Sequence, residues 1–150
     1  MKRTSMEGVA CPVARSLDVM GDWWSLLIVR DAMLGLRRFG EFQKSLGVAK
    51  NILSQRLKHL MAHGILEVQP ASDGSAWQEY VLTQKGRRLF PVLVALREWG
   101  AEHCFEQGEP RTVMLDTAQG LPVKPLELRA ADGRLLDLQD TRLVREPAER

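Results

Sequence analysis

Between residues 50 and 64, apolar side chains recur at steps of three and four positions. Leu53, Leu57 and Leu60, with Met61 beside them, fall on one side of a helix. This spacing predicts an amphipathic helix that buries one stripe and ends at the glycine that closes the range.

A shorter helix is predicted directly before it, over residues 39–46. Phe39, Phe42 and Leu46 give this segment its apolar side. Gly47 ends the helix at little cost, because glycine adopts a positive φ easily. Two helices joined by so tight a turn form a helix-turn-helix, a motif that places its second helix in the major groove of DNA.

The polar side of the second helix carries groups that bind nucleic acid, because amides and hydroxyls read base edges and lysines reach phosphates. The predicted set is Lys50, Asn51, Ser54, Gln55 and Lys58, with His59 on the same side. Residues 37–63 hold six lysines and arginines against one glutamate, a net charge of +5 in a chain whose total is +2. This concentration favours double-stranded DNA as the partner over the alternative, an ordinary helix pair with a solvated face.

Three arginines near the motif have open roles. Arg37 and Arg38 precede the first helix, where they are placed to contact backbone phosphates, although Arg38 could instead be structural. Arg56 lies within the second helix and could either reach a phosphate or pair with an acid inside the domain.

A β-hairpin is predicted directly after the second helix. Residues 65–69 and 77–82 have the composition of short strands, and Asp73-Gly74 between them is a strong signal for a tight turn. A hairpin behind a recognition helix is a wing. The wing residues predicted to contact phosphate are Ser72 and Ser75.

Two further helices are predicted before the motif. Pro12 suits the first turn of a helix that ends at Gly21, and Asp22 suits the N-cap of the next one. That next helix, over residues 22–34, is nearly all apolar but too short to span a bilayer. We therefore expect it in the core.

A long helix is predicted after the wing, from Thr83 as its N-cap to about residue 105. Pro91 should kink it or restrict its start. Such a helix either packs on its own domain or pairs with a second copy of the chain. The residues assigned to a homodimer interface are Leu93, Leu96 and Trp99, together with the N-terminal helix.

The character of the chain changes after residue 105. Over residues 106–150, prolines and glycines separate short apolar runs, and Asp132-Gly133 is a second hairpin signal. We expect a small β-rich appendage of two or three short strands with a disordered end from Val144. Nine acids against seven bases give it a net charge of −2, so it is not a second DNA-binding surface. It contains no cysteine and no histidine, so no zinc site is expected.

The composition, 45% hydrophobic and 27% charged, is typical of a soluble globular protein. The chain has no apolar run of transmembrane length, no secretory signal and only two distant cysteines, so a cytoplasmic location is expected. No catalytic spacing or phosphate-binding glycine loop is evident, so we expect neither an enzyme nor a cofactor. His59 and His63 are spaced to share a metal on a helix, but a third ligand is not apparent.

Taken together, these segments resemble the HxlR-type transcriptional regulators, a winged-helix family related to the MarR group. The resemblance covers residues 10–105. It rests on CPV at 11–13, GDWWSLLIVRD at 21–31, RRFGEFQ at 37–43, LSQRLKHL at 53–60, HGIL at 63–66, EYVLTQKGRRL at 79–89 and PVLVALREWG at 91–100. It implies an α+β fold, a winged helix-turn-helix DNA-binding domain with a long C-terminal dimerisation helix. It also implies a homodimeric bacterial transcription factor, usually a repressor.

The sequence departs from the family pattern in two places. The wing loop, SDGSAW at 72–77, has no lysine or arginine, which weakens the expectation that its tip contacts DNA. Some relatives with a C-terminal extension carry cysteine pairs that resemble a zinc ribbon, and this appendage has none.

Cys11 is the candidate redox sensor. It begins a helix, whose dipole favours the reactive thiolate. The resemblance adds that several HxlR-type proteins use a cysteine in this Cys-Pro context to sense oxidants or electrophiles. The alternative is a buried, inert cysteine.

We favour a homodimeric repressor that reads a palindromic operator with the helix at 50–63 and responds to a redox signal or an unidentified small-molecule effector. One alternative is a winged-helix protein-interaction module that has lost specific DNA binding. Another is a regulator gated by a ligand held between the dimer helices and the winged domain.

Overall fold

The computed structural model describes residues 4–147 and residue 149. The chain divides into two compact units, Met1–Leu93 and Val94–Arg150. Within the described ranges, no helix is long and apolar enough to cross a membrane.

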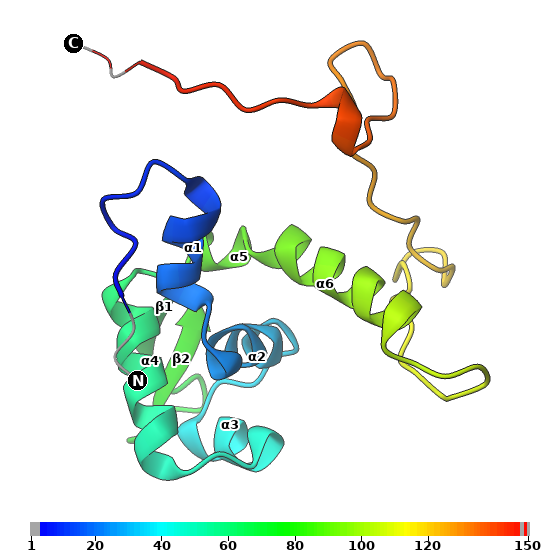
Figure 1. The fold of residues 1–150 in the computed structure, drawn as a ribbon. Coiled ribbons are helices and arrows are strands. Elements are labelled where there is room, and N and C mark those ends of the chain that lie inside the picture. Colours follow the sequence, from blue (N-terminus) through cyan, green and yellow to red (C-terminus); the bar gives the residue numbers. More distant parts are fainter. Residues whose placement is uncertain (1–3, 148, 150) are drawn as a thin grey trace. The chain divides into compact units, whose positions relative to one another are not determined.

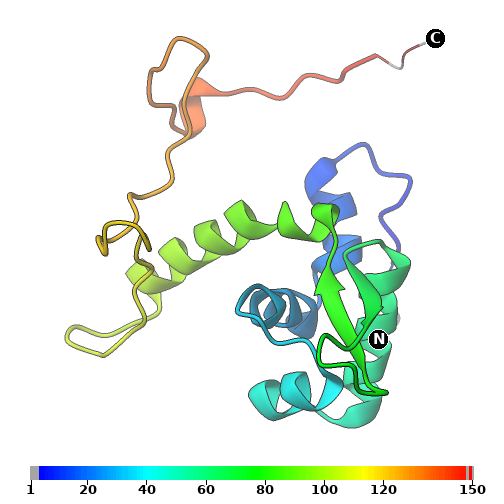
Figure 2. The ribbon, with the colours of Figure 1, turned by 180° about the vertical axis from the view of Figure 1, so that it is seen from behind.

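The first unit is the predicted winged helix-turn-helix, with its elements in the expected order (Figures 1 and 2). These elements are α1 (Pro12–Met20), α2 (Trp23–Met33), α3 (Phe39–Leu46), α4 (Lys50–Ala62), β1 (Leu66–Pro70), β2 (Gln78–Leu82), α5 (Gln84–Arg87) and the start of α6 (Phe90–His103). Helix α2 packs against α3, α4 and β2, and α4 packs against α1, α3 and β1. The central position predicted for α2 is therefore confirmed.

Helices begin and end at the residues whose local sequence signals predicted it. The Oδ1 atom of Asp22 accepts the backbone N–H groups of Trp24 and Ser25, both at 2.9 Å, and so caps α2. Gly47 adopts φ 63° after α3, and its N–H donates to the carbonyl of Gln43 at 2.9 Å. A residue with a Cβ would be strained in this left-handed corner, so glycine allows the tight turn into α4.

The core lies beneath the two helices of the motif. The predicted stripe of α4 is confirmed, since each of its three leucines is at most 1% exposed. The side chains buried with it are Ile28, Val29, Phe42, Ile65 and Leu66, from α2, α3 and the chain around the start of β1. Because these residues anchor α4 along one side only, its opposite side is left for solvent or a partner.

The wing is an antiparallel hairpin in which Val68 is paired with Tyr80. Gly74 takes φ 76° in the connecting loop, as the Asp-Gly signal predicted. The N–H of Tyr80 also donates to the carbonyl of Arg37 at 2.7 Å. This bond ties β2 to the segment that leads into α3.

The single helix predicted after the wing is two helices in the structure, the short α5 and the longer α6. Thr83 caps α5, its Oγ1 accepting the N–H of Gly86 at 3.0 Å, as expected. The chain then turns at Arg88, and α6 starts at Phe90 with Pro91 in its first turn. Proline is favourable there because its missing N–H would have no helical partner. The prediction of a continuous helix was wrong at this point, and the expected effect of Pro91 on the start is confirmed.

The second unit contains most of α6 and the appendage. Pairing in the described part of the appendage is limited to two isolated antiparallel bridges, Leu115 with Pro122 and Arg129 with Leu135. A short 3-10 helix, η1 (Leu138–Asp140), follows, and residues 141–147 form no regular element. The two or three short strands expected here are not formed by the described residues, which have two small bridged loops instead, seen in yellow and orange in Figure 1. The disordered end predicted from Val144 lies partly outside the described residues.

Candidate nucleic-acid interface

The outer face of α4 is polar, basic and open. Lys50, Asn51, Gln55 and Lys58 are exposed, and Ser54 is half-buried. Within the described part of the chain, these five side chains form no hydrogen bond and no ion pair. The structure therefore brings the whole predicted set together on one helix, with its donors and acceptors available to a partner.

Basic side chains around this helix fall into two groups. Arg37, Arg38 and Arg56 each have a carboxylate partner, in Glu79, Asp73 and Asp22 respectively. By contrast, Lys44, Lys50 and Lys58 have no ion pair among the described residues. An unpaired lysine binds a phosphate at a lower free-energy cost, because no internal ion pair has to be broken first.

Arg56 takes the second of its two proposed roles in this structure. Its Nε lies 3.6 Å from Oδ1 of Asp22, the residue that caps α2. That separation is an ion pair but too long for a hydrogen bond, and the buried Nε has no hydrogen-bond partner. Burial raises the pKa of Asp22, but the hydrogen bonds from Ser25 and the charge of Arg56 outweigh it, so that the pKa is lowered overall.

Arg37 is tied to the wing through Glu79. Its Nη1 lies 3.3 Å from Oε2 of Glu79, whose Oε1 accepts the N–H and the hydroxyl of Ser72 at 3.1 and 2.9 Å. The hydrogen bonds from Ser72 lower the pKa of Glu79, and Arg37 adds to this effect. The hydroxyl of Ser72 is therefore already hydrogen-bonded within the protein.

The wing tip is organised around Asp73. The N–H of Ser75 donates to its Oδ1 at 2.9 Å, and Arg38 donates to its Oδ2. The Ser75 bonds and the Arg38 guanidinium lower the pKa of Asp73 to about 2. Arg38 thus has the structural partner that was considered for it, and Ser75 is held by the turn.

Two neighbours of the interface were missed by sequence reasoning. A groove of about 910 Å³ lies between α3 and the wing, and its lining includes Lys44, Lys50 and Trp77. Trp77 is 70% exposed at the start of the returning strand. The sequence shows Trp77 close to the Asp73-Gly74 turn, but only the fold shows that it shares a groove with Lys44 and Lys50.

His59 was expected on the polar side of α4, but it is only partly exposed. Its Nε2 donates to the carbonyl of Val19 at 2.8 Å, which links α4 to α1, and its ring lies 4.5 Å from that of His63. The prediction failed because the carbonyl belongs to a segment 40 residues away. No group of three metal-binding side chains occurs in the described residues.

The residues assigned to a dimer interface differ in exposure. Leu93 is half-buried against the core of its own domain, whereas Leu96 and Trp99 are 51% and 62% exposed. Val13 of α1 is 67% exposed. Cys11 is exposed at the N-cap of α1, so it is not buried in the single chain.

Comparison with known proteins agrees with the winged helix-turn-helix fold. The sequence profile of a family described as HxlR-like helix-turn-helix matches residues 19–108. Rv3095 of Mycobacterium tuberculosis (strain ATCC 25618 / H37Rv), an uncharacterised HTH-type transcriptional regulator, is 36% identical over 116 residues, which cover 67% of this chain and 73% of the relative.

Two solved structures are also similar. The crystal structure of PA1607, a candidate transcription factor, is 55% identical, has a TM-score of 0.90 and covers 95% of this chain and all of its own. The redox regulator HypR in its reduced form is 30% identical, with a TM-score of 0.58 over 63% of this chain and 94% of its own. The family shows that the protein is a regulator rather than an enzyme. The chain belongs to the HxlR-like helix-turn-helix family of transcriptional regulators.

Proposed function

We propose that this protein is a homodimeric repressor that reads a palindromic operator with α4. The observation that carries the proposal is the outer face of α4, where amides and lysines are exposed and unpaired while the leucines of the same helix are fully buried. Two such helices related by a twofold axis would read half-sites about one helical turn, ~34 Å, apart.

The proposed roles follow from side-chain chemistry. Asn51 and Gln55 read base edges, because their amides donate and accept at once. Lys50 and Lys58 neutralise phosphates, and Lys44 joins them from α3. Contacts from Arg37 and Arg38 would require these arginines to exchange Glu79 and Asp73 for phosphate.

Dimerisation is proposed through α1 and α6. Val13, Leu96 and Trp99 are large apolar side chains that are more than half exposed in the single chain. Burying them against a second copy would remove this apolar surface from water, which is the main driving force for association. The same arrangement would set the spacing of the two α4 helices.

We further propose that the appendage is metal-free and packs along α6. Within the second unit, the N–H of Leu126 donates to Glu98 at 2.8 Å, and Arg111 donates to the carbonyl of Ala101 at 2.6 Å. Arg97 binds the carbonyl and the hydroxyl of Thr112 at 2.8 and 2.6 Å. Isolated bridges are marginal by themselves, so these contacts to the helix are needed to hold the segment.

Cys11 is proposed as an oxidant-sensitive position of this cytoplasmic regulator. Its exposed thiol at the start of α1 is open to reagents, and the similar protein HypR is a redox regulator. A quinone or mild oxidant should change the DNA affinity of the wild-type protein and leave Cys11→Ser unaffected. Equal responses of the two proteins would remove Cys11 from the proposal.

A protein-interaction module that has lost specific DNA binding is the second candidate. It is favoured by the wing loop, which has no cation of its own and holds Arg38 in an ion pair. Selection of binding sites from random duplexes separates the two functions. Enrichment of a palindrome supports the repressor, whereas no enrichment at low salt supports the interaction module.

A further inference from the structure

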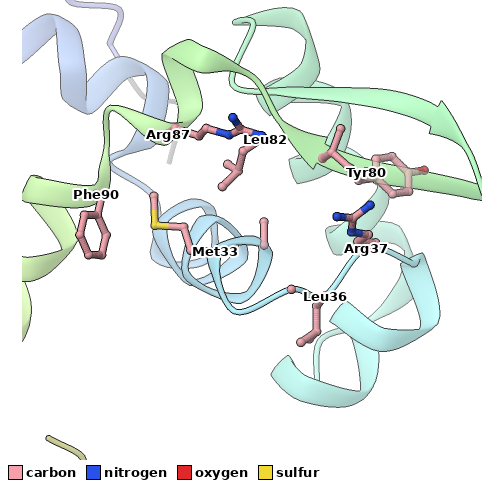
Figure 3. Close-up of a pocket in the computed structure, with 10 residues that line it drawn as sticks. Met33, Leu36, Arg37, Tyr80, Leu82, Arg87 and Phe90 are labelled. Carbon is pink, nitrogen blue, oxygen red and sulfur yellow. The ribbon is translucent and has the colours of Figure 1, made fainter. Parts of the chain in front are cut away.

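A pocket of about 510 Å³ opens in the winged unit, and its lining contains no residue of α4 (Figure 3). Its walls come from the end of α2, the segment before α3, strand β2, α5 and the first residue of α6. A volume of this size is within the range of small-molecule sites in proteins.

The walls are mostly apolar and partly aromatic. Met33 and Leu36 lie on one side, Tyr80 and Leu82 come from β2, and Phe90 lies beyond them (Figure 3). Phe90 is 50% exposed even though it is one of the largest apolar side chains of the domain. Tyrosine, phenylalanine and methionine together suit a flat aromatic group, because rings stack and thioethers pack against ring edges.

The charged groups of the pocket all have one sign. Arg37 and Arg87 reach it from the segment before α3 and from α5, and no carboxylate belongs to its lining. Arg37 shares its charge with Glu79 at 3.3 Å. Arg87 has no side-chain hydrogen bond and no ion pair within the described residues. A guanidinium at an apolar surface without an anion is a ready partner for a carboxylate, which it can bind through two parallel bonds.

We propose that this pocket binds a small aryl carboxylate, with the ring against Met33 and Phe90 and the carboxylate at Arg87 and Arg37, beside Tyr80. The charge selects an anion, and the lining selects an aromatic body. Such a ligand would be the effector of the regulator proposed above, but its binding to the pocket requires neither DNA nor dimerisation.

The same site has a route to the DNA-binding surface through Arg37. Besides the ion pair to Glu79, Arg37 accepts the N–H of Tyr80 through its carbonyl at 2.7 Å. Glu79 in turn holds Ser72 of the wing loop. A bound carboxylate that draws the Arg37 guanidinium from Glu79 would loosen the wing and change DNA affinity. This second step rests on the proposed function.

Calorimetric titration of the full-length chain with cinnamate tests the binding step. Cinnamate should bind one site per chain with a Kd below about 1 mM. Cinnamamide, which has the same shape without the charge, should bind at least about tenfold more weakly, as should cinnamate to Arg87→Gln, because each change removes a charged hydrogen bond. Arg88→Gln is the matched control, since Arg88 is exposed in the same turn but does not line the pocket. It should bind cinnamate like the wild type.

The location of the ligand is tested by fluorine NMR. Tyr80 is the single tyrosine of the chain, so 3-fluorotyrosine gives one resonance, inside the proposed site. Cinnamate should shift this resonance with the Kd found by calorimetry. Absence of binding, equal binding of cinnamamide, tighter binding of octanoate than of cinnamate, or binding that leaves this resonance or the Arg87→Gln affinity unchanged would overturn the proposal.

Two outcomes separate this site from the proposed function. Saturable binding with no effect on the affinity for a selected duplex would confirm the pocket and remove the coupling through Arg37. Failure of the chain to select any duplex would reject the repressor, while the calorimetric and NMR results would still decide the pocket.

Discussion

Arg38 and Asp73 form an ion pair between the N-cap of α3 and the tip of the wing, across 35 positions of sequence. Asp73 also accepts the N–H of Ser75 and so shapes the loop in which it lies. The only strongly lowered carboxylate pKa of the described residues thus belongs to the residue that joins the wing to the recognition motif.

The lowered pKa predicts how the wing responds to acid. The folded-state pKa of about 2 lies below the ordinary value of 3.8, so the folded state holds the ionised form more strongly than the unfolded chain. This stabilising contribution is present in full above pH 3.8 and is lost as the pH falls through about 2. Carbon-detected NMR titration of the Asp73 carboxyl should give a midpoint near 2, well below that of a solvated aspartate.

The control for this titration is Arg38→Gln. Removing the guanidinium should raise the pKa of Asp73 while the Ser75 bonds keep it below the ordinary value, because those bonds are the larger cause. Equal midpoints in the wild-type protein and in Arg38→Gln would show that the wing tip and α3 are not joined in solution.

Gly86 is expected to be intolerant of any side chain. A Cβ at this position would lie 2.3 Å from the carbonyl oxygen of Ile65 and 3.0 Å from Leu82. Gly86→Ala should therefore lower the free energy of unfolding by about 2 kcal/mol, since backbone overlap outweighs the gain in helix propensity. Urea denaturation measures the change.

Gly40→Ala is the matched substitution. Gly40 is also helical, and a Cβ there meets nothing within 4 Å, so its effect should be neutral or stabilising by up to about 1 kcal/mol. Equal stabilities of the two variants would mean that α5 does not sit against Ile65 as described.

The local elements of the winged unit were predictable because each follows from short-range signals. The period of Leu53, Leu57 and Leu60 predicted α4 and its buried side, and all three side chains are buried. Caps and corners at Asp22 and Gly47 were equally clear, because capping depends on neighbours in sequence.

Long-range pairs were not predictable from those signals. Nothing in the spacing of charges shows that Arg37 meets Glu79, 42 positions away, or that His59 meets the carbonyl of Val19. The break at Arg88 was not located because the apolar period runs through it, although Pro91, one residue into α6, was expected to restrict the start of the helix. The contacts to DNA and the dimer interface stay predictions.

If the dimer forms through α6, replacing apolar side chains of this helix by charged ones should give monomers. Leu96→Glu combined with Trp99→Glu should yield a folded monomer, because four carboxylates in two copies would be buried in one apolar interface. Sedimentation velocity at micromolar concentration measures the state, and circular dichroism confirms that the helices persist.

Trp77→Glu is the comparison, since Trp77 is at least as exposed as Trp99 but lies in the wing loop, next to the start of β2. This variant should sediment like the wild type. A wild-type protein that is already monomeric at micromolar concentration would contradict the dimer.

DNA affinity as a function of salt concentration tests the role of α4 most directly, measured on a selected duplex and on random DNA for Gln55→Ala and Lys58→Ala. Gln55→Ala should lose about 1–3 kcal/mol on the selected duplex and little on random DNA, because it removes a base contact. Lys58→Ala should weaken both and lower the salt slope by about 1, because it removes a phosphate contact. Lys124→Ala, a lysine of the appendage, should change neither. Equal losses on both duplexes for the two α4 variants, with an unchanged salt slope, would contradict the account.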